Sequence, residues 1–351
     1  MTSPSVRIST RAVGAGRPCY VIAEAGVNHN GDLELARRLV DAAADAGADA
    51  VKFQTFRAER LMTAATPKAP YQERAPGIPA DAFEMIRHLE LDEDAHRALV
   101  DHCRARDIQF LSSPFEEASA DLLERLGLPA FKLPSGEVTN LPFLAHVARK
   151  GKPVILSTGM ATLGEVGCAM AALAPLGPNQ VVLLHCVSSY PARPADVNLR
   201  AMATLAKAFP VVVGYSDHTP GLEVSLAAVA LGAAVLEKHL TLDRSLPGPD
   251  QAASLEPGEF RALVQGVRNV EAALGHGRKE PAPCEQEVAV VARKSVVAAQ
   301  DLAAGTVLEA GHLAIKRPGT GLPPNALSTL IGRTLLRDLS RDATLAMEDL
   351  E

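Results

Sequence analysis

The sequence contains no tryptophan, and aromatic residues make up only 4% of it. Aliphatic side chains must therefore fill the core of this 351-residue chain, in which 47% of the residues are hydrophobic. The sequence also lacks a basic start followed by an apolar run, and no stretch is long and apolar enough to span a membrane. These absences predict a cytoplasmic protein with no membrane partner.

Cysteines and clustered basic residues are also scarce. The five cysteines are scattered and never spaced as CxxC, which favours a reducing compartment over a disulfide framework. The formal net charge is −6 and no long lysine or arginine block is present, so we expect no nucleic-acid partner. No HExxH, Walker or GxGxxG pattern occurs, which argues against the common zinc proteases, nucleoside-triphosphate enzymes and dinucleotide enzymes.

Short β-branched runs alternate with alanine- and leucine-rich segments that have helical spacing. The eight runs are Tyr20–Glu24, Ala50–Thr55, Ile108–Ser113, Ala130–Leu133, Val154–Thr158, Val181–Cys186, Val211–Tyr215 and Ala234–Lys238. They are apolar enough to be buried on both faces of a parallel sheet. Eight β-then-α units predict an α/β fold of the (β/α)₈ TIM-barrel type.

Two interruptions of this rhythm indicate further organisation. A polar, proline-containing insertion runs from Arg57 to Glu90, and we expect it to cover the mouth of the barrel. Near residue 275, glycine, proline and charged residues break the periodic pattern. We therefore predict a barrel domain over residues 1–280, a linker over 281–290 and a small β-rich domain over 291–351. The last domain is too small to bury much surface alone.

Polar residues follow almost every predicted strand at its C-terminal end, where the reactive residues of barrel enzymes lie. Helix capping by a hydroxyl, or a hydrogen-bonded interior histidine, would explain any one of them alone. Neither explains why polar residues gather at the same end of eight strands. The set includes Glu24, Lys52, Gln54, Ser113, Lys132, Ser135, Glu137, Ser157, Ser188, Tyr190, Ser216, Asp217, His218, Glu237 and His239.

Two lysines in this set, Lys52 and Lys132, would point into the barrel mouth, where an uncompensated ammonium group is unfavourable. An anionic ligand would offset that penalty, and serines at neighbouring strand ends would donate hydrogen bonds to a phosphate. These serines are Ser113, Ser135, Ser157 and Ser216. A phosphorylated carboxylate fits this set of groups. The alternative is that the lysines only pair with Glu24 and Glu137.

His218 and His239 follow the seventh and eighth runs, so we expect their imidazoles to converge on one ion. Two histidines without a cysteine favour a divalent ion such as Mn²⁺, Fe²⁺, Co²⁺ or Zn²⁺ and leave coordination positions for water and substrate. Asp217 and Glu237 stand beside the histidines in the sequence and would orient the two rings.

Specific segments spread over nearly the whole chain carry a family pattern. They are Ile22–Gly31, Lys52–Thr55, Lys132–Glu137, Leu156–Met160, Gly214–Thr219, Glu237–His239 and Pro247–Asp250, together with Lys316–Gly319 in the tail. With these segments the chain resembles the sialic acid synthases, which include the legionaminic and pseudaminic acid synthases. The tail is similar to the antifreeze-like (SAF) domain that closes these enzymes.

The resemblance implies a reaction between phosphoenolpyruvate and an N-acylated amino-sugar aldehyde. The acceptor would be N-acetylmannosamine or 2,4-diacetamido-2,4,6-trideoxymannose, and the products a nine-carbon α-keto acid and phosphate. It also implies that His218 and His239 bind the metal, with Mn²⁺ expected first and Mg²⁺ or Co²⁺ as alternatives. Arg317 would reach the sugar's acyl group from a partner subunit, so the expected assembly is a domain-swapped homodimer.

The resemblance further implies which residues surround each substrate. Those around phosphoenolpyruvate would be Lys52, Lys132, Ser135, Ser157 and Ser216. Those around the sugar would be Glu24, Gln54, Glu137, Tyr190 and Asp250. The chain departs from the family at Ser188, where many members carry Asn or a Thr-Glu pair, and this departure puts a phosphate contact there in question. The run from Leu242 to Asp250 looks closer to the legionaminic-type members.

The general base for the water that attacks C2 would be Glu24 or Glu137, and the sequence does not choose between them. One alternative function is a lysine-dependent aldolase with a Schiff base on Lys52 or Lys132. Another is a synthase that uses a phosphorylated sugar. A catalytically dead sugar-binding or ice-binding protein is the alternative from a different class.

Overall fold

The computed structural model describes residues 4–69, 72 and 79–351. The chain divides into two compact units, the barrel unit Met1–Gly275 and the C-terminal unit His276–Glu351, and each is described by itself. In the described part of the chain, no helix combines the length and apolar character needed to cross a membrane.

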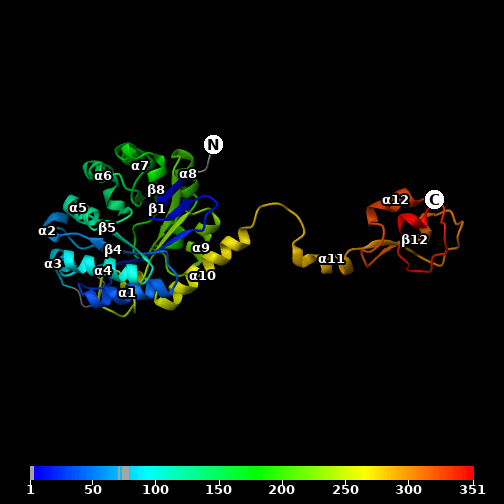
Figure 1. The fold of residues 1–351 in the computed structure, drawn as a ribbon, viewed down its shortest axis with the longest axis horizontal. Coiled ribbons are helices and arrows are strands. Elements are labelled where there is room, and N and C mark those ends of the chain that lie inside the picture. The colour runs from blue at the N-terminus through cyan, green and yellow to red at the C-terminus, as the bar shows by residue number, and fades with distance from the viewer. Residues whose placement is uncertain (1–3, 70–71, 73–78) are drawn as a thin grey trace. The chain divides into compact units, whose positions relative to one another are not determined.

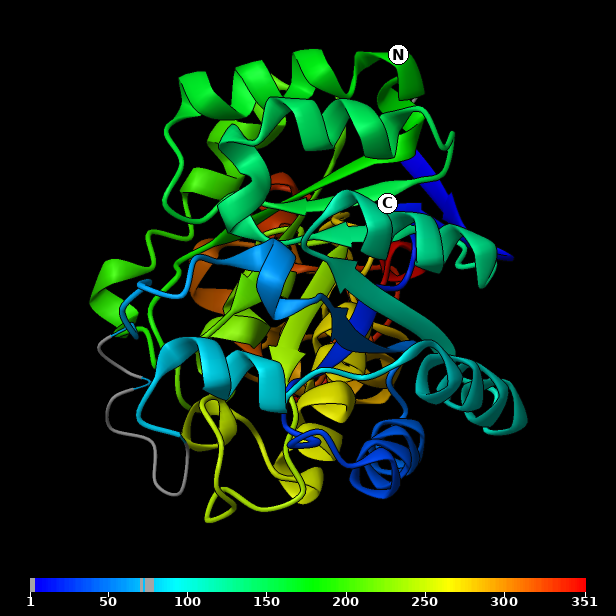
Figure 2. The ribbon, with the colours of Figure 1, turned by 90° about the vertical axis from the view of Figure 1, so that its left-hand side faces the viewer.

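Eight parallel strands form the central sheet of the barrel unit, and helices lie on the outside of these strands (Figures 1 and 2). The strands are β3 (Tyr20–Gly26), β4 (Ala50–Thr55), β5 (Gln109–Pro114), β6 (Phe131–Leu133), β7 (Val154–Ser157), β8 (Val181–Cys186), β9 (Val212–Asp217) and β10 (Val235–His239). The sheet order is β5-β4-β3-β10-β9-β8-β7-β6. β3 and β10, the first and last of these strands along the chain, are therefore paired. The sheet is a nearly closed barrel, which confirms the predicted TIM-type fold.

One main helix follows each strand and packs its apolar side on the barrel. These helices are α1 (Leu33–Asp45), α4 (Glu93–Ala105), α5 (Glu117–Arg125), α6 (Leu141–Ala148), α7 (Leu163–Ala172), α8 (Ala201–Ala208), α9 (Glu223–Ala230) and α10 (Pro257–Leu274). In α1 the buried residues Ala36, Leu39, Val40 and Ala43 recur at helical spacing, and the Asp32 side chain accepts hydrogen bonds from the first turn. Apolar residues thus recur at helical spacing in the helices, whereas the strands are continuous apolar runs, and this difference produces the alternation of strands and helices.

The insertion between β4 and α4 contains two short helices, α2 (Ala58–Leu61) and α3 (Ala82–His88). Leu61 and Ile86 from these helices pack with Phe56 and Phe115 in a small apolar cluster. Leu61 and Ile86 also line the cavity at the barrel mouth, as expected for a covering insertion. Residues 70–71 and 73–78 of the insertion lie outside the described residues.

A hairpin that the sequence patterns did not predict covers the opposite end of the barrel. It consists of β1 (Ser5–Ile8) and β2 (Arg11–Gly14), paired antiparallel. Its buried side chains pack against the first residues of several barrel strands. The hairpin residues are Val6, Ile8 and Val13, and the strand residues include Tyr20, Ala50, Val212 and Val235. We call this apolar end the floor.

The C-terminal unit is small and β-rich, as predicted. It contains α11 (Gln286–Ala292), β11 (Ser295–Ala298), β12 (Leu313–Lys316) and α12 (Leu327–Leu330), and β11 pairs antiparallel with β12. Both strands lie within residues 291–351, the range expected for the small β-rich domain. Its own core is aliphatic and is built largely from leucines that include Leu302, Leu308 and Leu345.

Candidate active site

A cavity of about 380 Å³ opens where the barrel strands end. Each of the eight strands, or the loop that follows it, contributes polar or charged lining. The predicted residues that line the cavity are Glu24, Lys52, Gln54, Ser113, Lys132, Ser135, Ser157, Ser188, Tyr190, Ser216, His218, His239 and Asp250. The structure therefore brings together most of the residues that the sequence had nominated, from positions more than 200 residues apart.

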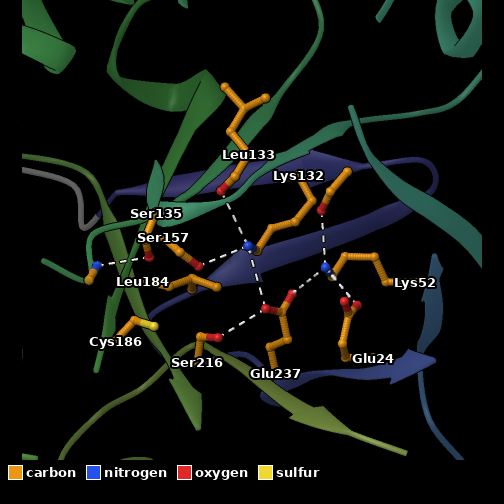
Figure 3. Close-up of polar contacts among 12 residues, drawn as sticks. Glu24, Lys52, Lys132, Leu133, Ser135, Ser157, Leu184, Cys186, Ser216 and Glu237 are labelled. Atoms are coloured by element: carbon orange, nitrogen blue, oxygen red, sulfur yellow. Dashed lines mark hydrogen bonds and ion pairs between the residues drawn. The ribbon is translucent and has the colours of Figure 1, made fainter. Parts of the chain in front are cut away.

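The base of the cavity is a buried cluster of two lysines and two glutamates (Figure 3). The Lys52 ammonium lies 2.6 Å from Glu24 Oε2 and 3.8 Å from Glu237 Oε2. The Lys132 ammonium lies 3.4 Å from Glu237 Oε1. Glu237 therefore bridges the two lysines. Of the alternative pairings with Glu24 and Glu137, the structure has Lys52 with Glu24, and Glu137 pairs with neither lysine. We call these four residues the ion cluster.

Serine hydroxyls from the neighbouring strands complete the ion cluster (Figure 3). Lys52 donates to Ser113 Oγ at 3.0 Å, and Lys132 donates to Ser157 Oγ at 2.8 Å. The Ser216 hydroxyl donates to Glu237 Oε1 at 2.9 Å. Each ammonium is thus held next to a hydroxyl that can also donate to an anion.

Burial disfavours the charged form of every member of the ion cluster. It raises the pKa of Glu24 to about 7, although Lys52 opposes this shift. It also lowers the pKa of Lys132, against the attraction of Glu237. For Lys52, burial is outweighed by Glu237 and Glu24, and its pKa is raised. A ligand with several negative charges would stabilise both ammonium groups in this buried setting.

The two predicted metal ligands lie side by side at the ends of adjacent strands. The ring centroids of His218 and His239 are 5.3 Å apart, and the Tyr190 ring packs against both. His218 Nδ1 lies 2.7 Å from the Val187 carbonyl oxygen. A proton on Nδ1 donates to that carbonyl and leaves the Nε2 lone pair available.

His239 has a different environment. Its Nδ1 is buried, has no hydrogen-bond partner among the described residues, and lies 3.9 Å from the Asp250 carboxylate. Burial and the neighbouring His218 hold the pKa of His239 well below its usual value, so the ring is neutral and carries a lone pair. Among the residues that the structure describes, no group of three or more histidine, cysteine or acidic side chains is arranged to hold a metal. His218 and His239 are therefore the candidate ligands that the described residues bring together.

Three predictions about individual residues need correction or qualification. Glu137 lies in a 3₁₀ turn (Ser135–Thr139), where its carboxylate accepts a hydrogen bond from Asn140 at 2.7 Å, and it does not line the cavity. Glu237 belongs to the ion cluster and Asp217 pairs with Lys238; within the described residues neither acid has a hydrogen bond to a histidine ring, so a ring-orienting role for them stays a prediction. Arg317 lies in the C-terminal unit.

The sequence reasoning missed Cys186 and the apolar part of the cavity wall. Cys186 lines the cavity, and its Sγ lies 3.8 Å from His218 Nδ1. Its register partner is Ser216, which also lines the cavity, so strand alternation contained the signal that would have found it. The apolar wall comprises Val27, Phe56, Leu61, Ile86 and Phe115. Much of it comes from the insertion and its flanks, where no strand period applies.

A barrel whose mouth buries lysines, carboxylates and paired histidines defines an enzyme of the (β/α)₈ class with an anion-binding active site. Residues 39–279 match the NeuB family and residues 293–351 match the SAF domain. The chain belongs to the NeuB family, which confirms the resemblance recognised in the sequence.

Relatives agree with this assignment over nearly the full chain. The N,N'-diacetyllegionaminic acid synthase of Legionella pneumophila is 46% identical over 96% of this chain and 96% of its own length. The enzyme of the same name from Campylobacter jejuni is 47% identical over 92% of this chain and 97% of its own. The crystal structure of N-acetylneuraminic acid synthetase from Leptospira borgpetersenii is similar with a TM-score of 0.72 at 37% identity, covering 82% of this chain and 95% of that one.

Proposed function

We propose that this chain condenses phosphoenolpyruvate with the open-chain aldehyde of an N-acylated amino sugar, giving a nine-carbon α-keto acid and phosphate. The ion cluster and its serines, placed next to a pair of histidines in one cavity, carry this proposal. The relatives named as synthases of legionaminic and neuraminic acids support the same reaction type.

Lys52 and Lys132 bind the anionic groups of phosphoenolpyruvate. Both ammonium groups are almost fully buried and are held by carboxylates from the protein. Phosphate and carboxylate oxygens of the substrate form charge-assisted hydrogen bonds with the ammonium groups. Hydroxyls of Ser113, Ser157 and Ser216 are within the same cluster and orient the phosphate. The enol carbon is thereby held towards the sugar aldehyde.

His218 and His239 hold a divalent cation in this proposal, with Mn²⁺ expected first and Co²⁺ or Mg²⁺ as alternatives. The site fits such an ion because the His218 ring is anchored through Nδ1 and because buried His239 Nδ1 lacks a partner. When bound, the ion supplies Lewis-acid polarisation of the aldehyde oxygen of the sugar.

Glu24 is the general base for the water that adds at C2 of the condensed substrate. Its carboxylate lines the cavity, accepts a hydrogen bond from Gln54 at 3.1 Å, and lies next to Lys52. A pKa of about 7 suits a base that takes a proton from water near neutral pH. Phosphate then leaves from C2. Glu137 is the weaker candidate because it does not line the cavity.

The acceptor is 2,4-diacetamido-2,4,6-trideoxymannose rather than N-acetylmannosamine. The two sugars differ at C6, where the first has a methyl group and the second a hydroxymethyl group, and at C4. The apolar wall of Phe56, Leu61, Ile86 and Phe115 offers apolar contacts to a methyl group, and these contacts support the trideoxy sugar. Relatives with the diacetyllegionaminic name point in the same direction.

The working unit is a domain-swapped homodimer in which Arg317 of a second subunit contacts the acyl group of the sugar. This part of the proposal rests on the family resemblance and on the SAF match over residues 293–351. A cytoplasmic location is part of it as well. The five cysteines are all free, which suits a reducing compartment.

The test is phosphate release from phosphoenolpyruvate with a panel of amino sugars, before and after chelation. We expect release only with an N-acylated amino sugar, highest with the trideoxy acceptor, and loss of release on chelation that Mn²⁺ restores. A Schiff-base aldolase would instead turn over pyruvate in the presence of chelator, and borohydride would trap pyruvate covalently on Lys52 or Lys132. No turnover with any sugar would favour a binding protein.

A further inference from the structure

A second buried ion pair joins the two residues that immediately precede His218 and His239 in the sequence. Asp217 and Lys238 are register partners at the last rung of the β9–β10 ladder, and His218 and His239 follow them. The preceding rung, Ser216 and Glu237, lines the cavity, so strand alternation turns Asp217 and Lys238 to the outer face of the barrel wall. Their side chains are fully buried there, and Lys238 Nζ lies 2.8 Å from Asp217 Oδ2.

The pair holds the chain on both sides of His218. Asp217 Oδ1 accepts hydrogen bonds from the backbone N–H and the hydroxyl of Thr219, each at 2.8 Å. Lys238 donates to the carbonyl oxygen of Thr219. His218 is therefore the single residue between two anchored neighbours, and its own carbonyl accepts from the Ala192 N–H at 2.9 Å.

His239 comes directly after Lys238, so the ion pair anchors the residue that precedes it. The His239 carbonyl accepts a hydrogen bond from the Leu255 N–H at 2.9 Å. Asp217 also accepts from Ser225 of α9 at 2.5 Å and from the Tyr215 hydroxyl at 3.2 Å. The carboxylate is thus fully hydrogen-bonded, and α9 is tied into the same network. Both histidines therefore directly follow residues of one buried network in which the Asp217 carboxylate is fully hydrogen-bonded.

The location of this pair is informative because buried ion pairs are rare in this chain. Among residues 4–69, 72 and 79–351, every other ion pair with both side chains under 10% exposed lies in the cavity itself. A buried pair seldom adds net stability over apolar residues of similar size. A role in setting geometry accounts better for a fully buried pair that stands next to two histidines.

We propose that the Asp217–Lys238 pair is a positioning device that sets the separation and direction of His218 and His239 for one divalent cation. This inference rests on the proposed metal site and extends it to two residues that do not touch the ion. Residues that hold metal-binding histidines in place without touching the metal change metal affinity about 10- to 100-fold when they are removed. Here the ion pair would position the backbone next to each histidine and would not contact the imidazole rings.

The test variant is Asp217→Asn combined with Lys238→Met, which removes both charges and leaves no unpaired ion. Mn²⁺ affinity is measured from the free-ion signal in electron paramagnetic resonance during titration of the metal-free protein. We expect binding about 10- to 100-fold weaker than in the wild type. The thermal shift caused by phosphoenolpyruvate in chelator is expected to stay unchanged, because the ion cluster lies on the other face of the strands.

The matched control is Asp121→Asn with Lys150→Met, which removes a partly buried ion pair between α5 and the turn after α6. Its Mn²⁺ affinity should equal that of the wild type. Unchanged affinity in the Asp217/Lys238 variant would overturn the proposal, as would an equal loss in the control. If the wild type binds no Mn²⁺, the proposed metal site itself fails.

A milder variant keeps the test decisive if the double variant does not fold. Ser225→Ala removes one hydrogen bond to Asp217 from α9, away from both histidines and from the cavity. We expect roughly a threefold loss of Mn²⁺ affinity with an unchanged response to phosphoenolpyruvate, which is smaller than the effect of the double variant because the other hydrogen bonds to Asp217 remain. Affinity equal to that of the wild type would reject the positioning role.

Discussion

The mouth and the floor of the barrel differ sharply although the same eight strands connect them. At the mouth, lysines, glutamates and histidines are buried, and the lysines and glutamates pair with one another and with serine hydroxyls. At the floor, Val6, Ile8 and Val13 of the hairpin cover apolar strand starts. A larger cavity of about 530 Å³ lies beside the hairpin, but its Arg11 is already paired with Asp49.

This contrast shows where the fold obtains its stability and where it accommodates chemistry. Apolar burial at the floor stabilises the barrel without specifying any ligand. Buried charges at the mouth oppose folding unless they are paired, and the pairs that form there leave groups ready for an anionic substrate. Substitutions at the two ends should therefore have separable effects on activity and stability, as in other barrels of this class.

The largest expected effect is at the mouth. His218→Ala or His239→Ala removes a proposed metal ligand and should lower kcat/KM on the order of 10³-fold, because Lewis-acid stabilisation of the transition state amounts to several kcal/mol. Steady-state phosphate release at saturating Mn²⁺ measures this change. Circular dichroism and thermal unfolding should show a folded barrel. Near-wild-type activity in either folded variant would remove the metal from the mechanism.

At the floor we expect the reverse. Ile8→Ala should reduce the free energy of unfolding by about 3 kcal/mol, because a buried aliphatic side chain is replaced by a partial void. Ile8→Val, the matched control, should reduce it by about 1 kcal/mol. Urea unfolding measures both. The kcat/KM values should stay at the wild-type level, and a large kinetic loss would mean that the two ends are coupled.

Acid should lower the free energy of unfolding through His29, which is fully buried in the loop after β3. Burial lowers the pKa of His29 to about 4, below its usual 6.5. Between these values the unfolded chain binds a proton that the folded chain does not, so this stabilisation is complete above about pH 6.5 and is lost as the pH falls towards 4.

At pH 5 the loss from His29 should reach about 2 kcal/mol relative to pH 7. The comparison is urea unfolding of the wild type and of His29→Asn, whose amide oxygen can still accept the Gly31 N–H. The variant should be less stable at pH 7 but should lose less stability on acidification. Parallel pH curves for the two proteins would show that His29 does not titrate on unfolding.

The smallest expected effect is at Glu137. Because its carboxylate binds Asn140 and does not line the cavity, Glu137→Gln should change kcat/KM by less than about threefold, equivalent to under 1 kcal/mol. Glu24→Gln is the contrasting variant and should lose at least about 100-fold as the general base. Equal losses in the two variants, measured by phosphate release, would return Glu137 to the reacting groups.

Most of the fold was predictable because each strand is a short apolar run with its own turn and helix. The predicted run Ala50–Thr55 is strand β4, and Val181–Cys186 is strand β8. The hairpin β1–β2 was missed because two strands of four residues carry little periodic signal. Their apolar face becomes evident only against the floor that the barrel strands create.

Site residues within a strand were predicted well, and site residues in the turns that follow the strands were predicted less well. Lys132 keeps the strand alternation of β6 and points into the cavity. Glu137 lies two residues into a 3₁₀ turn, so its direction depends on the turn and on Asn140. Asp217 was expected to orient a ring, but alternation places it behind the barrel wall with Lys238.

The sequence by itself determined the kinds of groups at the barrel mouth, because polar residues stand at strand ends whatever the closure of the sheet. Only the tertiary structure decided which groups pair. Glu237 bridges Lys52 and Lys132, and Asp217 meets Lys238, because closure of the barrel sets the distances between residues on different strands. Coulombic attraction and hydrogen bonding depend on those distances, which no local pattern in the chain contains.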